Sequence, residues 1–363
     1  MSERKINWLD VFKLSGAYLA LMVGSGFATG QEAMQFFVVF GWQAYAIIVV
    51  TLLLLGYSAR SLMLAGRHHG ITTNEETFQH FCGPILGSLL TWYTMIMIVA
   101  VTAVMLAGAA ATLEQAYKVP HYIGSGLLAL LVMATLMLGL RRILDVMAII
   151  GPLLIVLTII IASFSFVTNA DGIDFGARKV HELDVLKATP HWAFAGFVYV
   201  GLTLPGVASL LPKIGSTVKS DREITAIALL GPLLIISAMT IVVTALLASI
   251  ETVYSAEVPI LALADSALPV YGSVFAGVIF LGIYTTITPL LWTVCSRFSE
   301  EGTTRYRALV VMLATTAFLG ATILPFGQLL NIIFPSIGYV GLLILASIVI
   351  ADLRKIAWFS PFA

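Results

Sequence analysis

The sequence predicts an all-α polytopic membrane protein with ten transmembrane helices. Three observations predict this class: apolar residues make up 60% of the 363-residue chain, charged residues make up only 10%, and long apolar runs recur along its length. An ordinary soluble domain is about 45–50% apolar and about 25% charged, so the composition excludes a water-soluble enzyme. Because lipid cannot satisfy an open backbone, the apolar runs are expected to be helices.

The expected spans divide the chain into two halves of five helices. A helix needs about 20 apolar residues to cross the hydrocarbon core. The halves are a first five-helix repeat at 1–167 and a second at 191–363, joined by an extracellular connection at 168–190, all in a single membrane domain. The ten spans are expected at 8–40, 43–66, 84–116, 121–140, 143–167, 191–213, 223–250, 270–296, 305–324 and 327–352.

The basic residues fix the expected orientation. Excess Lys and Arg mark the cytoplasmic loops of a membrane protein. One set of alternating loops carries 15 of them, namely Arg4, Lys5, Lys13, Arg60, Arg67, Arg141, Arg142, Lys213, Lys219, Arg222, Arg297, Arg305, Arg307, Arg354 and Lys355. The other set carries 4, namely Lys118, Arg178, Lys179 and Lys187. Both termini are therefore expected in the cytoplasm, and the second half, which begins outside, is inverted relative to the first.

The first span contains an interruption. As one straight helix it would reach about 50 Å at 1.5 Å per residue, and its middle reads Gly24-Ser25-Gly26-Phe27-Ala28-Thr29-Gly30-Gln31-Glu32. Each glycine weakens a helix by about 1 kcal/mol. Close helix packing is the alternative role of these glycines. Packing does not require Gln31 and Glu32 at membrane depth, so we expect an unwound segment here.

The sixth span repeats this design. Its sequence Gly201-Leu202-Thr203-Leu204-Pro205-Gly206 is expected to open or kink the helix. A plain proline kink without a ligand is the alternative. Interrupted helices at corresponding positions of two inverted halves are the best sequence indication of a transporter binding site.

A short cytoplasmic helix is expected between the second and third spans. Thr73-Asn74-Glu75-Glu76 has the pattern of a capping box, in which the Thr oxygen and the Glu carboxylate satisfy free N–H groups. The helix should run through Phe81.

These features resemble the amino acid–polyamine–organocation superfamily with the LeuT fold, a 5+5 inverted repeat in which helices 1 and 6 are broken. The run from Gly24 to Glu32, followed by Gln35-Phe36-Phe37, looks closest to the YkvI-like bacterial membrane proteins. The resemblance implies a carrier in the bacterial cytoplasmic (inner) membrane that works by alternating access. It also implies a substrate site at the breaks, formed by Ser25, Gly26, Phe27, Phe197, Tyr199, Gly201, Leu202 and Thr203, with Thr102 on helix 3 as a further candidate.

The resemblance also implies a Na⁺ site between helices 1 and 8. Its ligands would be the carbonyls of Ala20 and Val23 together with Gly282, Thr285 and Thr286. Positions three and four apart share one helix face, and hard oxygen ligands suit a hard cation. The alternative is that both hydroxyls simply bond to carbonyls of their own helix. Helix 5 contains no lysine, which argues against the lysine-dependent proton coupling of some superfamily members.

Glu32 is the acid that is hardest to explain, because an intramembrane carboxylate is costly. It could bind a cationic substrate group, carry a proton or form an outer gate. Alternatively, it caps the outer half-helix and interacts with the helix dipole. Sodium-coupled amino acid carriers of this fold often have a basic residue on this half-helix, so an acid here departs from their pattern.

The resulting functional prediction is Na⁺-coupled symport of a small organic solute, an amino acid or related amine or carboxylate. Proton coupling through Glu32 and a non-transporting membrane nutrient sensor are the alternatives. No enzyme is expected, since the chain has no Walker A, H-E-x-x-H or G-x-S-x-G motif. Na⁺ is the expected coupling ion, with no other cofactor. The expected partners are the solute and membrane lipid, without nucleic acid, and the sequence does not indicate an oligomeric state.

Overall fold

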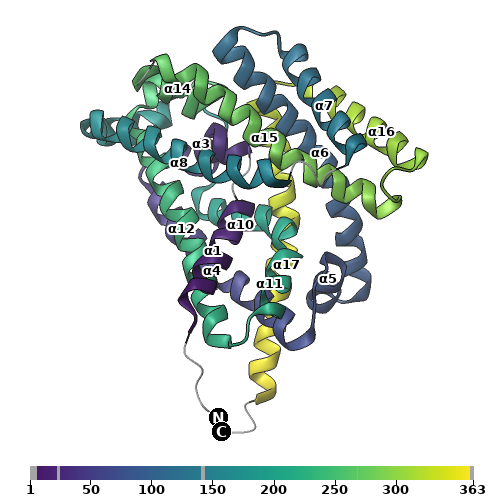
Figure 1. The fold of residues 1–363 in the computed structure, drawn as a ribbon. Coiled ribbons are helices and arrows are strands. Elements are labelled where there is room, and N and C mark those ends of the chain that lie inside the picture. Colours follow the sequence, from purple (N-terminus) through teal and green to yellow (C-terminus); the bar gives the residue numbers. More distant parts are fainter. Residues whose placement is uncertain (1–5, 23–24, 140–143, 268, 360–363) are drawn as a thin grey trace.

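The computed structural model describes residues 6–22, 25–139, 144–267 and 269–359. Every regular element in these ranges is a helix, and the long helices are gathered side by side (Figure 1). The protein is an all-helical polytopic membrane protein, as predicted.

Seven described helices are long and apolar enough to cross a membrane. An eighth candidate is the pair α10 (Trp192–Val207) and α11 (Leu210–Thr217), whose axes differ by 64°. The seven are α4 (Gln43–His69), α6 (Pro84–Tyr117), α7 (His121–Leu138), α8 (Leu144–Thr168), α12 (Asp221–Ala248), α15 (Pro269–Phe298) and α17 (Phe326–Phe359).

The first and ninth expected spans contain no described helix that is both long and apolar enough to cross a membrane. The count of ten spans therefore remains a prediction. The ninth corresponds to α16 (Thr304–Ala321), whose first turn carries two arginines that lower its hydropathy. The first corresponds to four short elements, namely α1 (Trp8–Met22), α2 (Ser25–Thr29), α3 (Gln31–Phe36) and the 3₁₀ turn η1 (Val38–Phe40).

The first span is interrupted at Gly30, within the glycine motif. Gly30 separates α2 from α3 and has a φ of 84°, a left-handed conformation that a residue with a Cβ adopts only at a cost. The expected unwound segment is otherwise helical where it is described, since Ser25–Thr29 forms α2 and Gln31 and Glu32 begin α3. Residues 23 and 24 lie outside the described ranges.

The sixth span is also bent, but not where its glycines predict. α10 remains helical from Gly201 through Pro205 and ends at Val207, so the bend falls at residues 208–209. Pro205 cannot bond the carbonyl of Gly201, yet a single lost bond kinks a helix without unwinding a whole turn. The expected opening at 201–206 is therefore wrong, and the break lies just after it.

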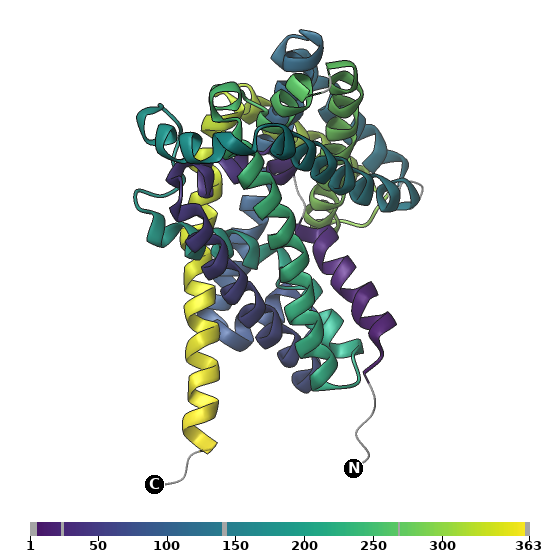
Figure 2. The same cartoon turned by 90° about the vertical axis from the view of Figure 1, so that its left-hand side faces the viewer.

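Two groups of helices build the molecule. In the first group, α4 packs against α10, α11 and α12, and α1 packs against α12. In the second group, α6 packs against α7, α15 and α16. α17 joins the groups because it contacts both α10 and α6 (Figures 1 and 2). The short helix α2 contacts α6 and α15, so the interruption of the first span lies at the boundary between the groups.

Short helices lie at both ends of the molecule. α5 (Asn74–Cys82) lies toward the end where α1 begins and α17 ends, and α14 (Pro259–Ala267) lies toward the opposite end (Figure 1). α5 begins with the predicted capping box: Thr73 accepts from the Glu76 N–H, and the Glu76 carboxylate accepts from the Thr73 N–H.

Candidate functional site

A buried carboxylate lies beside the interruption of the first span. Glu32 belongs to the first turn of α3 and is only 8% exposed. Its side chain lies directly against Gly26 of α2, where a Cβ would overlap the carboxyl group. The missing side chain of Gly26 therefore provides the space that the Glu32 carboxylate occupies.

Glu32 joins the two interrupted spans. The Tyr199 hydroxyl of α10 donates a hydrogen bond of 3.4 Å to Glu32 Oε2. Tyr199 is 2% exposed, whereas Phe197, the other aromatic residue expected to cover a ligand, is 40% exposed. The structure thus brings Tyr199, and not Phe197, into the buried cluster.

Aromatic rings pack against Tyr199. Phe36 and Phe37 meet the Tyr199 ring edge-on, with centroid distances of 5.4 and 5.1 Å. Phe27, on α2, is 1% exposed. The Glu32 carboxylate therefore bonds a buried aromatic residue, and this long hydrogen bond is its only one within the described residues.

No described Lys, Arg or His lies within ion-pair distance of Glu32. A buried charge without a counter-ion is costly. Gly30 is the N-cap of α3, and within the described residues the Glu32 carboxylate accepts no backbone N–H, so capping bonds do not explain the burial of Glu32.

A polar network lies on a second side of α3. Gln31 Nε2 donates to the carbonyls of Ala256 and Glu257, each at 3.1 Å. Gln35 Nε2 donates to the Gly327 carbonyl at 2.8 Å and to Gln31 Oε1 at 3.0 Å. These bonds fasten α3 to the segment before α14 and to the start of α17.

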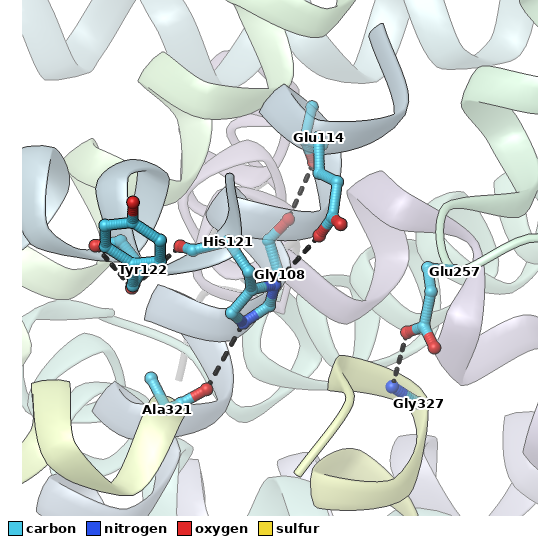
Figure 3. Close-up of polar contacts among 9 residues, drawn as sticks. Gly108, Glu114, His121, Tyr122, Glu257, Ala321 and Gly327 are labelled. Carbon is cyan, nitrogen blue, oxygen red and sulfur yellow. Dashed lines mark hydrogen bonds and ion pairs between the residues drawn. The ribbon is translucent and has the colours of Figure 1, made fainter. Parts of the chain in front are cut away.

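Two further bonds complete this network. Asn331 Nδ2 donates to Gln35 Oε1 at 2.9 Å. The Gly327 N–H donates to Glu257 Oε2 at 2.9 Å, a bond that Figure 3 shows. Gln31 and Gln35 were not predicted to form a network. Their i, i+4 spacing in an apolar span could have indicated one, since such residues share a helix face.

A separate contact joins three helices of the second group. His121 Nδ1 lies 3.3 Å from Glu114 Oε2, and His121 Nε2 lies 3.3 Å from the Ala321 carbonyl oxygen (Figure 3). Glu114, His121 and Ala321 belong to α6, α7 and α16. This contact ties together one end of the three helices and does not involve Glu32.

The hydroxyls of Thr285 and Thr286 both bond a carbonyl of their own helix, which is the arrangement expected without a Na⁺ site. Thr285 Oγ1 and Thr286 Oγ1 donate to the same carbonyl oxygen of Gly282, at 2.8 and 2.9 Å. Three oxygens therefore gather on one helix face, and each hydroxyl keeps lone pairs that can bind a cation. Ala20 lies in the last described turn of α1. Val23 lies outside the described residues.

The remaining predicted substrate residues have different surroundings. Ser25, Gly26 and Phe27 are the first described residues of α2. Thr102 and Thr203 bond carbonyls of their own helices, each at 2.8 Å. Leu202 is half-buried in the continuous part of α10.

Gly201 serves helix packing. A Cβ at this position would overlap the carbonyl oxygen of Gly338, and a Cβ on Gly341 would overlap that of Gly201. The residue lets α10 and α17 approach closely, and it does not mark an unwound segment.

Two cavities lie apart from the Glu32 cluster. One of about 530 Å³ is lined by Phe164, Phe175, Ser249 and Glu251 among others, and one of about 450 Å³ is lined by Asp10, Lys13, Lys219 and Glu223 among others. Across the described ranges, no group of three or more His, Cys, Asp or Glu residues is arranged to hold a metal ion.

The chain is distantly homologous to bacterial membrane proteins. It is 25% identical over 337 residues to "Uncharacterized membrane protein YkvI" of Bacillus subtilis (strain 168), covering 91% of this chain and 92% of the relative. It is 24% identical over 345 residues to "Uncharacterized protein YyaD" of the same organism, covering 94% and 97%. No family model matches the chain.

Its fold is LeuT-like. The structure matches that of Mhp1, a nucleobase-cation-symport-1 family transporter, in a closed conformation with bromovinylhydantoin bound. The TM-score is 0.56 at 15% identity, and the match covers 92% of this chain and 75% of Mhp1. The LeuT-like fold that the sequence resemblance implies is thereby confirmed at the level of architecture.

Proposed function

We propose that this chain is a secondary active transporter that moves a small organic solute by alternating access, coupled to Na⁺. The observation that carries the proposal is the contact between the two interrupted spans, in which Glu32 beside the first break meets Tyr199 of α10. Interrupted helices facing each other are where transporters of this kind bind solute and ion. Mhp1, which shares the fold, is itself a transporter.

The two helix groups supply the moving parts of the proposal. α2 belongs to the first span and touches α6 and α15 of the second group. A solute bound at α2 would therefore contact both helix groups. Relative motion of the groups would open the site first to one side of the membrane and then to the other. In this proposal the chain has ten spans as two inverted halves, with both termini in the cytoplasm.

The proposed substrate residues surround this boundary. They are Ser25, Gly26 and Phe27 of α2, Glu32, Tyr199, and the more distant candidates Thr102, Phe197, Gly201, Leu202 and Thr203. The close approach of Gly201 to α17 supports a role in positioning α10 rather than in binding.

The proposed Na⁺ site uses the oxygens of Gly282, Thr285 and Thr286, completed by the carbonyls of Ala20 and Val23. The convergence of three oxygens within one helix turn supports it.

Proton coupling is the second candidate, and the burial of Glu32 without a basic partner favours it. It predicts that a pH gradient drives uptake and that Glu32→Gln loses this response. If transport is instead coupled to Na⁺, uptake by the Thr293→Ala control should respond to a Na⁺ gradient like that of the wild type. The Thr293 hydroxyl donates to the Pro289 carbonyl, on the same helix as the proposed Na⁺ site.

Counterflow tests transport itself. Proteoliposomes preloaded with a mixture of amino acids and amines should exchange at least one of them for labelled solute outside. A protein that binds a solute, as judged by thermal stabilisation, but shows no counterflow would be a sensor, and the proposal of transport would be wrong.

A further inference from the structure

We infer that Glu32 binds a cationic nitrogen of the transported solute, so that the solute presents an ammonium group to α2 and not a carboxylate. This inference rests on the proposed function and names the chemical class of its substrate. The ligand would contact the Glu32 carboxylate and the Tyr199 ring.

The Glu32 carboxylate places a negative charge directly against α2. It lies so close to Gly26 that a single methyl group at Gly26 would overlap it. A solute carboxylate approaching α2 would meet a like charge at short range, whereas an ammonium group would meet an opposite one.

The hydrogen-bonding capacity of Glu32 is mostly unused. An ionised carboxylate can accept about four hydrogen bonds, and the described residues supply a single one of 3.4 Å from Tyr199. With no described cation within ion-pair distance, the acceptors of Glu32 are free to bind a donor brought by the solute. An ammonium group has up to three such donors.

Aromatic rings gather around Tyr199, the residue that bonds the carboxylate. Tyr199 has Phe36 and Phe37 beside it, with ring centroids 5.4 and 5.1 Å from its own. Cations are attracted to the faces of such rings, most strongly where water is excluded. A carboxylate combined with aromatic rings recognises a cationic nitrogen and offers nothing comparable to an anion.

Glu32 is separate from the polar network of α3. Gln31 and Gln35 bind the segment before α14 and the start of α17. Glu32 takes no part in those bonds and points instead toward α2 and α10. Its function is therefore distinct from holding α3 in place.

A thermal-shift experiment on the purified full-length protein tests the inference. The probes share the 3-methylbutyl group: 3-methylbutylamine attaches to it only an ammonium group, 4-methylpentanoate only a carboxylate, and leucine both. A wider panel of matched amines and carboxylates is screened in the same way. We expect the amines to raise the melting temperature and the matched carboxylates to have no effect.

Variants identify the residues responsible. Glu32→Gln keeps the size of the side chain and removes its charge, and should abolish the stabilisation by amines. Tyr199→Phe keeps the ring and removes the hydroxyl, and should retain it in part. Glu114→Gln is the matched control, because Glu114 is a half-exposed acid of another cluster, and should respond like the wild-type protein.

Three results would overturn the inference: stabilisation by the carboxylates, no stabilisation by any amine of the panel, or an unchanged amine response in Glu32→Gln. Where Glu32→Gln fails to fold, Gly26→Ala provides the same test, since a Cβ at Gly26 displaces the carboxylate. Na⁺-dependent counterflow of carboxylates that is insensitive to Glu32→Gln would refute this inference and leave the proposed function intact. Absence of counterflow for every solute would refute the proposed function.

Discussion

Gly201 of α10 and Gly341 of α17 lie so close together that a Cβ on Gly341 would overlap the carbonyl oxygen of Gly201. Pro205 leaves this carbonyl without its usual helical donor. The crossing point of α10 and α17 therefore coincides with the weakened turn of α10, just before the bend at residues 208–209. This arrangement fixes α10, and with it Tyr199, relative to α17.

The first prediction concerns this crossing. Gly201→Ala should lower stability by about 1–3 kcal/mol, because overpacking forces two backbones apart. Thermal unfolding in detergent measures the effect. Gly206→Ala is the matched control on the same helix, since a Cβ at that position would have no atom within 4 Å, and it should be neutral or raise stability by about 0.5–1 kcal/mol. Equal effects of the two substitutions would contradict the packing role of Gly201.

The second prediction concerns the oxygens of α15. Na⁺ should raise the melting temperature of the wild-type protein, and Thr285→Ala/Thr286→Ala should remove this response, because a bound ligand stabilises the folded state to a degree set by its affinity. At a Na⁺ concentration of about 100 times Kd the stabilisation would be about 2.7 kcal/mol. Thr293→Ala, on the same helix, should keep the full response. A double variant that responds to Na⁺ like the wild type would exclude this site.

The third prediction concerns the network on α3. Gln35 is 1% exposed and makes hydrogen bonds to Gln31, Gly327 and Asn331. Gln35→Leu should cost about 1–3 kcal/mol, since it leaves buried polar groups without partners. Hydrogen–deuterium exchange should rise in α3 and in the segment before α14. Gln79→Leu, at an exposed position of α5, is the control. Unchanged exchange in the Gln35 variant would show that the network does not hold α3.

The fourth prediction concerns pH and the start of α5. The N–H groups of Thr72 and Thr73 donate to the Glu76 carboxylate at 2.9 and 3.1 Å and hold its pKa below the ordinary value. Since the folded-state pKa is the lower one, the stabilisation is present above the unfolded pKa of about 4.3 and is lost as pH falls through the folded pKa. Glu76→Ala should therefore increase hydrogen exchange at residues 72–82 at neutral pH but make little difference once the pH lies below the folded pKa. A difference that does not change with pH would contradict this origin.

Local features were predictable from the sequence, because their determinants lie within a few residues. The capping box of α5 depends on Thr73 and Glu76, three positions apart, and the structure contains it. The interruption of the first span depends on Gly30, whose left-handed φ needs no distant partner. Eight of the ten spans expected from hydropathy correspond to described helices long and apolar enough to cross a membrane, counting the bent pair α10 and α11 as one.

Features that depend on distant partners were not predictable in the same way. Gly201 has the appearance of a helix breaker, and its role in packing becomes evident only with Gly338 and Gly341 of α17 beside it. The position of Glu32 depends likewise on the missing side chain of Gly26 and on Tyr199, which comes from the other half of the chain. The sequence identified Glu32 as unusual but could not choose among its roles.

Na⁺-driven accumulation of a solute tests transport and its coupling ion together. Proteoliposomes containing the full-length protein are incubated with a mixture of amino acids and amines, and their contents are analysed by mass spectrometry. We expect at least one solute to accumulate above its external concentration under an inward Na⁺ gradient, but not with equal Na⁺ on both sides, and Thr285→Ala/Thr286→Ala to abolish this accumulation. Accumulation that follows a pH gradient and ignores Na⁺, or no accumulation of any solute, would refute Na⁺-coupled transport.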